Sequence, residues 1–422
     1  MLSALSPDIR QYFIITGNYW AFTLTDGALR MLVVLHFHQL GYSPLDIALL
    51  FLFYEIFGVV TNLVGGWLGA RIGLNRTMNI GLALQVVALL MLTVPASMLT
   101  VVWVMAAQAL SGIAKDLNKM SAKSAVKQLV PADAQGRLFH WVAVLTGSKN
   151  ALKGVGFFLG GLLLSWLGFV GAVTLMAGAL SLVWVASLFF LKGELGKSQS
   201  KPKFTQVFST SRAINILSAA RMCLFASRDV WFVVALPVFM GEVLGWNPWQ
   251  VGAFMAAWVV GYGVIQSVAP WINRMISYNR KRGLAEKLPD GKAAVFWGVL
   301  LTVAASIPAV VLGQLGTDLS NQLALVSMVI ITALLVFGAL FAINSSVHSY
   351  LIVSYAREDG ASLDVGFYYM ANAMGRLLGT VLSGWVYQVW GLGACLWVSS
   401  GLLVLTVVIS FALPQNNKEV VN

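Results

Sequence analysis

The sequence predicts an all-α membrane protein with twelve transmembrane helices arranged in two six-helix halves. Of its 422 residues, 59% are hydrophobic and only 10% are charged, whereas soluble domains carry about 25% charged residues. The apolar residues form blocks, each long enough to cross a bilayer, which takes about 20 residues. Lys and Arg gather between alternate blocks, as the positive-inside rule describes. This composition excludes an ordinary soluble enzyme.

Twelve apolar blocks follow one another with short connections. Only helices and closed barrels satisfy the backbone inside a bilayer, and these continuous blocks lack the alternation of barrel strands, so we assign helices. The first ten residues are polar, contain Pro7 and precede no small-residue cleavage site, so we expect no cleaved signal peptide. The expected helices are 13–39, 45–69, 77–95, 98–122, 141–166, 170–191, 214–240, 249–272, 294–315, 323–347, 365–388 and 394–413.

The distribution of cations predicts the orientation. Of 27 Lys and Arg residues, which give the chain a net charge of +11, 19 lie in segments on one side and none in the six opposite connections. Both termini are therefore expected in the cytoplasm of a bacterium, with the chain crossing its cytoplasmic (inner) membrane many times. The longest polar stretch, residues 192–212, is expected to link an N-terminal half (1–191) to a C-terminal half (213–422).

The two halves repeat one another. When residues 40–76 are aligned with 244–280, nine of 37 positions are identical, against about three expected by chance. The alignment pairs Leu40-Gly-Tyr-Ser-Pro44 with Leu244-Gly-Trp-Asn-Pro248. Two parallel six-helix halves joined by a linker are the architecture of the major facilitator transporters.

A loop motif resembles the gating signature of that superfamily. The segment from Gly66 to Arg76 resembles Gly-x-x-x-Asp-Arg-x-Gly-Arg-Lys/Arg, with Ala70 where the family has Asp. The resemblance implies a gating loop, with Gly66, Arg71, Gly73 and Arg76 as its residues.

A closer resemblance covers essentially the whole chain. Residues 16–30, 111–123, 146–156 and 228–237 resemble the ArsJ family, the organoarsenical efflux branch of the superfamily. This resemblance implies export of 1-arseno-3-phosphoglycerate, which glyceraldehyde-3-phosphate dehydrogenase makes when arsenate replaces phosphate. Export followed by hydrolysis outside the cell would give arsenate resistance and a functional link to that dehydrogenase. We further expect a monomer in the lipid bilayer, with no cofactor, metal or nucleic-acid partner.

Charged residues inside the expected helices point independently to an anionic substrate. Such residues are costly in a bilayer and therefore face water, a ligand or each other. Eight cations exceed four acids, so four positive charges remain and predict an anion-binding site. The cations are Arg30, Lys115, Lys119, Lys149, Lys153, Arg221, Arg228 and Arg376, and the acids are Asp26, Glu55, Asp116 and Asp229.

The side-chain chemistry suggests a role for each cation. We assign Arg30, Arg228 and Arg376 to direct recognition of an oxyanion, because the guanidinium fork binds two oxygens and stays charged. The lysines attract and hold a second anionic end, with two of them nearer the cytoplasm forming an entry funnel. The second-end residues are Lys115, Lys149 and Lys153, the funnel residues Lys119 and Lys123, and the further substrate contacts Arg221, Tyr368 and Asn372.

Several alternatives stay open at this stage. Asp26 with Arg30, Asp116 with a neighbouring lysine, and Arg228 with Asp229 are possible structural ion pairs. Glu55 is either a proton carrier or the partner of a cation, and the four acids together are candidates for charge pairing or coupling. An organophosphate transporter or exchanger, and an anion channel, are alternative functions.

A membrane-embedded enzyme is disfavoured, because the sequence shows no paired carboxylates, histidine cluster or Ser-His-Asp constellation. The two cysteines, Cys223 and Cys395, lie on different expected helices and do not form a thiol motif.

Overall fold

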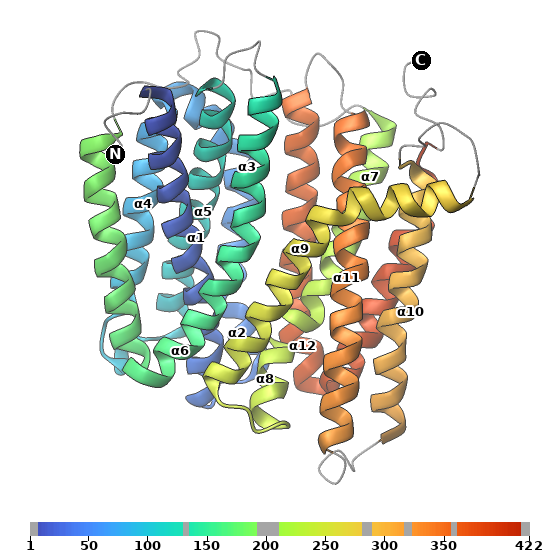
Figure 1. Ribbon diagram of the computed structural model, residues 1–422. Coiled ribbons are helices and arrows are strands. Elements are labelled where there is room, and N and C mark those ends of the chain that lie inside the picture. Colours follow the sequence, from blue (N-terminus) through green and yellow to red (C-terminus); the bar gives the residue numbers. More distant parts are fainter. Residues whose placement is uncertain are drawn as a thin grey trace. The chain divides into compact units, whose positions relative to one another are not determined.

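The computed structural model describes residues 7–129, 135–191, 211–280, 289–315, 323–355 and 361–414. These residues form helices and connecting turns without a strand, which confirms the all-α prediction (Figure 1). A short 3-10 helix covers Ala96–Met98. The α-helices are α1 (Pro7–Gln39), α2 (Pro44–Leu50), α3 (Leu52–Ile72), α4 (Leu74–Met91), α5 (Val101–Leu129), α6 (Gln135–Phe190), α7 (Arg212–Phe232), α8 (Ala235–Glu242), α9 (Pro248–Arg280), α10 (Gly291–Leu315), α11 (Leu323–Tyr355) and α12 (Ala361–Ser410).

Two long helices each cover two expected spans. Helix α6 bends at Gly168 and helix α12 at Gly391, with φ of 66° and 74°. These positive φ values favour glycine, which has no Cβ. Within the described residues, eight helices are long and apolar enough to cross a membrane. Helices α1 and α5, which carry several charged residues, are not among the eight, and the count of twelve spans stays a prediction.

The repeated motif adopts the same local structure in both places. Gly41 and Gly245 have φ of 83° and 67°, and Pro44 and Pro248 then begin α2 and α9. Proline favours the first position of a helix because its fixed φ suits the turn and its missing N–H has no partner there. The residue before each proline caps its helix: the Ser43 hydroxyl accepts the Asp46 N–H at 3.2 Å, and the Asn247 amide oxygen accepts the Gln250 N–H at 3.1 Å.

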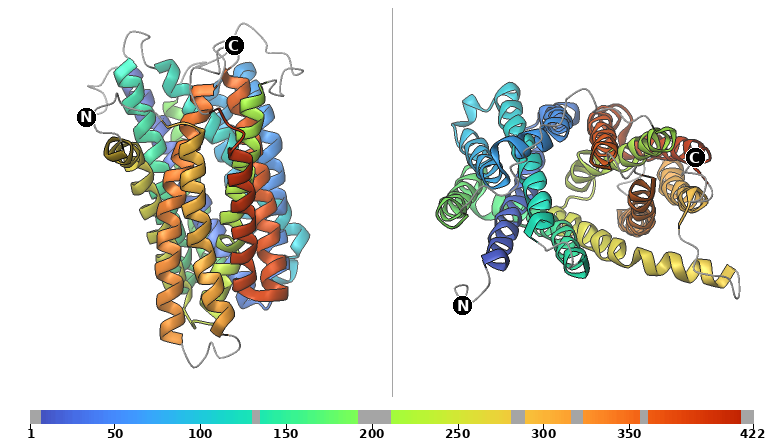
Figure 2. Two further views of the ribbon diagram at one scale, coloured as in Figure 1. Left: turned by 90° about the vertical axis from the view of Figure 1, so that its right-hand side faces the viewer. Right: turned by 90° about the horizontal axis from the view of Figure 1, so that it is seen from above.

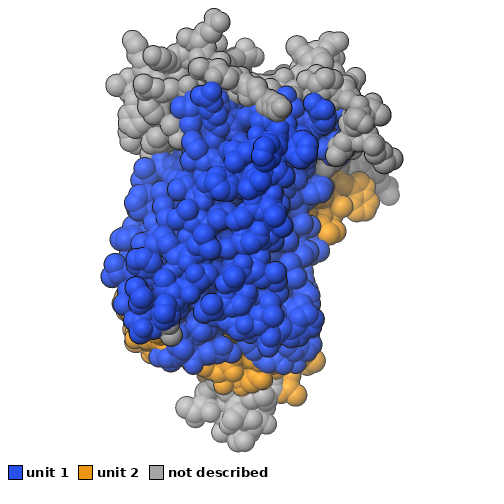
Figure 3. Space-filling view, turned by 90° about the vertical axis from the view of Figure 1, so that its left-hand side faces the viewer, with its two compact units in different colours: residues 1–41, 49–203, 247–260 blue, residues 42–48, 204–246, 261–422 orange. Residues whose placement is uncertain are grey.

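The chain forms two compact units (Figure 3). Unit 1 contains residues 1–41, 49–203 and 247–260, and unit 2 contains residues 42–48, 204–246 and 261–422. Most of the expected linker, residues 192–210, lies outside the described residues.

In unit 1, glycines bring the helices that carry the expected site residues close together. A Cβ on Gly27 of α1 would lie 2.8 Å from the Lys153 carbonyl oxygen, and one on Gly156 of α6 would lie 2.6 Å from the Leu24 oxygen. A Cβ on Gly112 of α5 would similarly lie 2.5 Å from the Tyr54 oxygen of α3. Small residues allow such close approach between helices in a membrane. The backbones of α1, α3, α5 and α6 are therefore fixed close to one another.

In unit 2, α7 and the first part of α12 run side by side (Figures 1 and 2). Gly375 packs directly on the Met222 backbone, and a Cβ on Gly379 would lie 2.7 Å from Asp229 Cβ. This packing brings Arg376, between the two glycines, next to the acid of α7.

Candidate anion-binding site

Unit 1 holds a cluster of charged side chains, here the unit 1 cluster, contributed by α1, α3, α5 and α6. The side chains of Arg30 and Glu55 are 11% and 1% exposed, and an Nη of Arg30 lies 2.7 Å from Oε1 of Glu55. The guanidinium also lies 5.2 Å from the ring centroids of both Phe51 and Tyr54. Contacts through Tyr54 and Asp116 join Arg30, Glu55, Asp26, Lys115, Lys119 and Asp116. We count Lys149 and Lys153, the two expected site residues of α6 in the same unit, with this cluster.

This geometry decides between the pairings open at the sequence level. Glu55 is the partner of a cation, Arg30, which lies 25 residues earlier on another helix. Asp26 instead accepts a hydrogen bond from the Tyr54 hydroxyl at 2.8 Å. Glu55 therefore neutralises Arg30, and Asp26 holds the Tyr54 ring that lies beside Arg30.

Two lysines of α5 share a single acid. Lys119 Nζ lies 3.0 Å from Oδ1 of Asp116 and donates to Oδ1 of Asn62 at 2.8 Å. Lys115 Nζ lies 3.8 Å from Oδ2 of Asp116 and 4.0 Å from the Tyr54 ring centroid. Asp116 is fully buried and lies within 4 Å of both lysines, so the formal charge of these three residues is +1.

The lysines of α6 are partly exposed. Lys153 Nζ lies 5.5 Å from the Phe157 ring centroid. Lys149 is also half-buried, one turn earlier on the same helix. Lys123 belongs to α5, but its side chain lies outside the described residues.

Unit 2 holds a second cluster, here the unit 2 cluster, of Arg221, Arg228, Arg376 and Asp229. Arg228 Nε donates to Oδ1 of Asp229 at 2.6 Å, and Arg376 Nε lies 3.6 Å from its Oδ2. Asp229 is fully buried, whereas the two arginine side chains are 15% and 16% exposed. One carboxylate thus holds two guanidinium groups that keep part of their surface open.

Arg221 is held by neutral partners. Its Nε donates to Oδ1 of Asn372 at 3.0 Å, and its Nη1 donates to the carbonyl and hydroxyl oxygens of Ser345, each at 3.0 Å. Its guanidinium carbon lies 4.1 Å from the Phe225 ring and 5.2 Å from the Tyr368 ring. Arg221, Tyr368 and Asn372, which the sequence analysis proposed as further substrate contacts, therefore lie together. Sequence reasoning missed Ser345 and Phe225, because a serine or phenylalanine in an apolar helix does not differ from a packing residue.

The expected gating loop forms the junction between α3 and α4. Gly73, with φ of 91°, precedes the first residue of α4, and Arg76 is exposed on that helix. Gly66 and Arg71 lie on α3, where the Arg71 side chain is outside the described residues. The loop is separate in sequence from both clusters.

Each cluster has the same excess of charge. The formal charges of the named residues sum to +2 in each, from five cations and three acids in the unit 1 cluster and from three cations and one acid in the unit 2 cluster. Cysteines add nothing to this chemistry, since Cys223 and Cys395 are buried and free. In the described part of the chain, no three His, Cys, Asp or Glu residues gather as a metal site would require. Hard cationic donors of this kind recognise oxyanions.

Comparison with known proteins identifies the family. The model of the Major Facilitator Superfamily matches residues 12–286, more than half of the chain. A crystal structure of a D-xylose–proton symporter matches with a TM-score of 0.68 and 13% sequence identity, covering 97% of this chain and 98% of that chain. No curated protein matches the chain. The apolar helices, the family match and the shared fold lead to one conclusion: the chain belongs to the major facilitator superfamily and is a membrane transporter, not an enzyme.

Proposed function

We propose that this transporter exports a small organic anion with two highly charged ends, specifically 1-arseno-3-phosphoglycerate, and thereby confers arsenate resistance. The excess of two positive charges in each cluster supports this proposal. A phosphate monoester carries close to two negative charges near neutral pH, and an arsenate ester has the same arrangement of oxygens. One such head group balances one cluster.

The carboxylates explain how the clusters remain stable without substrate. Glu55 and Asp229 occupy the arginines at hydrogen-bonding distance, where an oxyanion of the substrate would bind. An incoming head group replaces one charge-assisted bond by another, and its greater charge favours the exchange. We therefore infer that binding displaces Glu55 from Arg30 and Asp229 from Arg228 as alternating access proceeds.

An organophosphate transporter or exchanger is the second candidate, because a phosphoglycerate also presents a phosphate and a second anionic end to the same side chains. The two functions differ in whether arsenic crosses the membrane. They also differ in direction, since an exchanger moves phosphoglycerate in both directions.

The deciding experiment uses inside-out vesicles of bacterial cytoplasmic membrane. The vesicles contain the full chain and receive arsenate, glyceraldehyde-3-phosphate, NAD and the dehydrogenase, and arsenic in the lumen is measured. We expect accumulation that requires every component. Equal accumulation without the dehydrogenase would contradict the ester as substrate. Exchange of labelled 3-phosphoglycerate without arsenic accumulation would favour the second candidate.

Matched variants connect the result to the clusters. Arg228→Ala should abolish accumulation, whereas Lys292→Ala should not, because Lys292 is an exposed cation at the first turn of α10, outside both clusters. Both variants must be present in the membrane at the level of the parent chain. Equal accumulation in both would refute the assignment of Arg228 to the substrate.

A further inference from the structure

In each cluster, one buried aromatic ring contacts two cations. The ring in unit 1 is that of Tyr54, which is 4% exposed, and the ring in unit 2 is that of Phe225, which is 7% exposed. The Tyr54 ring centroid lies 5.2 Å from the guanidinium carbon of Arg30 and 4.0 Å from Nζ of Lys115. Apolar packing alone does not require that one ring contacts two charged groups, so the arrangement points to a role in the clusters.

The spacing along α7 places Phe225 between its two cations. Phe225 follows Arg221 by four residues and precedes Arg228 by three, so the three side chains lie on one face of the helix with the ring in the middle. The ring centroid lies 4.1 Å and 4.9 Å from the two guanidinium carbons. Phe341 of α11 holds the ring from the side, with the two ring centroids 5.3 Å apart in an edge-to-face contact. Both guanidinium groups therefore lie within reach of one ligand.

Tyr54 is placed between its cations by the packing of three helices. Its hydroxyl donates to Oδ1 of Asp26 on α1 at 2.8 Å. On α5, Gly112 lies one turn before Lys115, and a Cβ there would lie 2.5 Å from the Tyr54 carbonyl oxygen. On α3 itself, a Cβ on Gly58, one turn after Tyr54, would lie 3.3 Å from Nζ of Lys115. The two glycines thus allow the backbone and the ammonium group to lie close to the ring, and the hydrogen bond fixes the orientation of the ring.

The chemistry of a ring explains why an aromatic residue occupies this position. The face of an aromatic ring is electronegative and attracts a cation, but the ring has no net charge. A carboxylate at the same position would cancel one of the two positive charges, and an aliphatic side chain would not oppose the repulsion between them. Tyr54 and Phe225 therefore hold two cations near each other while both charges stay available to a ligand. The edge of the ring is electropositive, so an oxyanion that bridges the cations across this edge is not repelled.

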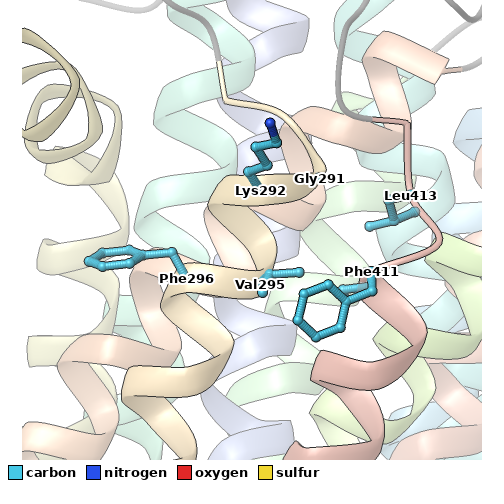
Figure 4. A pocket seen from close by; sticks show the side chains of 7 residues that line it. Gly291, Lys292, Val295, Phe296, Phe411 and Leu413 are labelled. Atoms are coloured by element: carbon cyan, nitrogen blue, oxygen red, sulfur yellow. The ribbon is translucent and has the colours of Figure 1, made fainter. Parts of the chain in front are cut away.

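A cation beside aromatic residues is not sufficient for this arrangement. A cavity of about 370 Å³ lies between the start of α10 and the end of α12, and Lys292 extends at its rim (Figure 4). Phe296 and Phe411 are among the residues that line it. Its lining residues, which all belong to the described part of the chain, include no cation besides Lys292. The cavity therefore lacks a pair of cations for a ring to hold, and Phe411 provides a control position.

We propose that Tyr54 and Phe225 are positioning residues that hold two cations for one doubly charged head group and thereby set the preference for a phosphate or arsenate ester over a singly charged ester. Without the ring, the two cations are free to move apart or toward the nearest carboxylate. The head group then meets one cation at a time. A dianion loses more from this change than a monoanion, because its second charge is left unbalanced. This inference rests on the proposed function, since it concerns how the same clusters recognise the head group.

The test compares two esters that differ in charge but share their shape. The purified full chain is titrated with 3-phosphoglycerate and with glycerate 3-sulfate, whose sulfate ester has the same tetrahedral oxygens but a single negative charge. In the parent chain, we expect the phosphate ester to bind more tightly. Tyr54→Leu and Phe225→Leu should each weaken binding of the phosphate ester roughly tenfold, because two cation–ring contacts are lost together, and should weaken binding of the sulfate ester much less. The ratio of the two affinities should therefore fall.

Further variants separate positioning from packing. Tyr54→Phe keeps the ring and loses only the hydroxyl, so it should retain most of the parent ratio. Phe411→Leu, at the control position, should change neither affinity. If the leucine variants are not recovered in folded form, Tyr54→Met and Phe225→Met replace them, because the flexible methionine side chain refills the space without an aromatic face.

Two outcomes would overturn the inference. An equal loss of affinity for both esters in the variants without a ring would show that the rings only support the packing. Unchanged affinities in these variants would show that the rings have no part in recognition. The failure of the proposed function gives a different pattern, in which the parent chain binds neither ester and accumulates no arsenic. That result contradicts both proposals, whereas the first two contradict this inference alone.

Discussion

The pairing of Arg30 with Glu55 makes a quantitative prediction about affinity. If the substrate competes with Glu55 for the guanidinium, Glu55→Gln should bind the anion more tightly. The parent bond is charge-assisted at 2.7 Å, with the carboxylate 1% exposed. Hydrogen bonds that involve a charged group contribute about 1.5–3 kcal/mol. A bond between two ions lies toward the upper end of this range, and a bond from the guanidinium to a neutral glutamine oxygen lies toward the lower end. Displacing a glutamine therefore costs about 1.4 kcal/mol less, which corresponds to roughly tenfold tighter binding.

The assay is a binding titration of the purified protein with 3-phosphoglycerate, which shares one end with the proposed substrate. Asp26→Asn is the matched control. It also removes one carboxylate from the unit 1 cluster, one turn from Arg30 on α1, but Asp26 accepts its hydrogen bond from Tyr54. We expect a smaller gain from this variant, because only the long-range field changes.

Two results would refute the reasoning. Unchanged affinity in Glu55→Gln would mean that the substrate does not displace the carboxylate. An equal gain in Asp26→Asn would mean that total charge, rather than competition for Arg30, determines affinity. Thermal unfolding of both variants separates these outcomes from loss of structure.

Three further predictions concern the arginines and the packing that positions them. Arg228→Lys should bind 3-phosphoglycerate roughly tenfold more weakly in the same titration, because lysine lacks the fork that makes two parallel bonds. Asp229→Ala should lower the free energy of unfolding by about 3 kcal/mol, measured by denaturation in detergent, because two arginines lose their buried partner. Gly156→Leu should greatly reduce the folded protein recovered from membranes, since its Cβ would lie 2.6 Å from the Leu24 oxygen, whereas Gly178→Leu on the same helix has nothing within 4 Å and should not.

The sequence predicted the parts of this structure that depend on local pattern. The apolar blocks are helices, and the two copies of the Gly-x-x-Pro motif form the same capped helix start. The pairs of Lys119 with Asp116 and of Arg228 with Asp229 were among the open alternatives, because their members are three and one residues apart. The i,i+3 spacing of the first pair favours contact on a helix surface, and the long arginine side chain reaches the adjacent aspartate in the second.

Contacts between helices could not be predicted in this way. Glu55 pairs with Arg30 because α1 and α3 are both held in the closely packed helices of unit 1, and this depends on glycines such as Gly112 that lie on other helices. Asp26, one turn from Arg30, was the nearer candidate in the sequence. Arg221 likewise finds Ser345 124 residues later. Each choice of partner depends on how a helix is rotated about its own axis relative to its neighbours. Side-chain packing determines this rotation, and the periodicity of the sequence does not.

The balance of charge gives a physical reason for a carrier rather than a channel. On insertion scales an arginine or lysine at the centre of a membrane helix costs about 3 kcal/mol, so a formal excess of two cations corresponds to about 6 kcal/mol in each cluster. This cost is small while water reaches the clusters and large when water is excluded. A head group with two negative charges removes the excess, so closure around the substrate is favoured over closure of an empty cluster. A monoanion leaves half of the excess, and the proposed selectivity for a doubly charged end follows from this difference more than from any single contact.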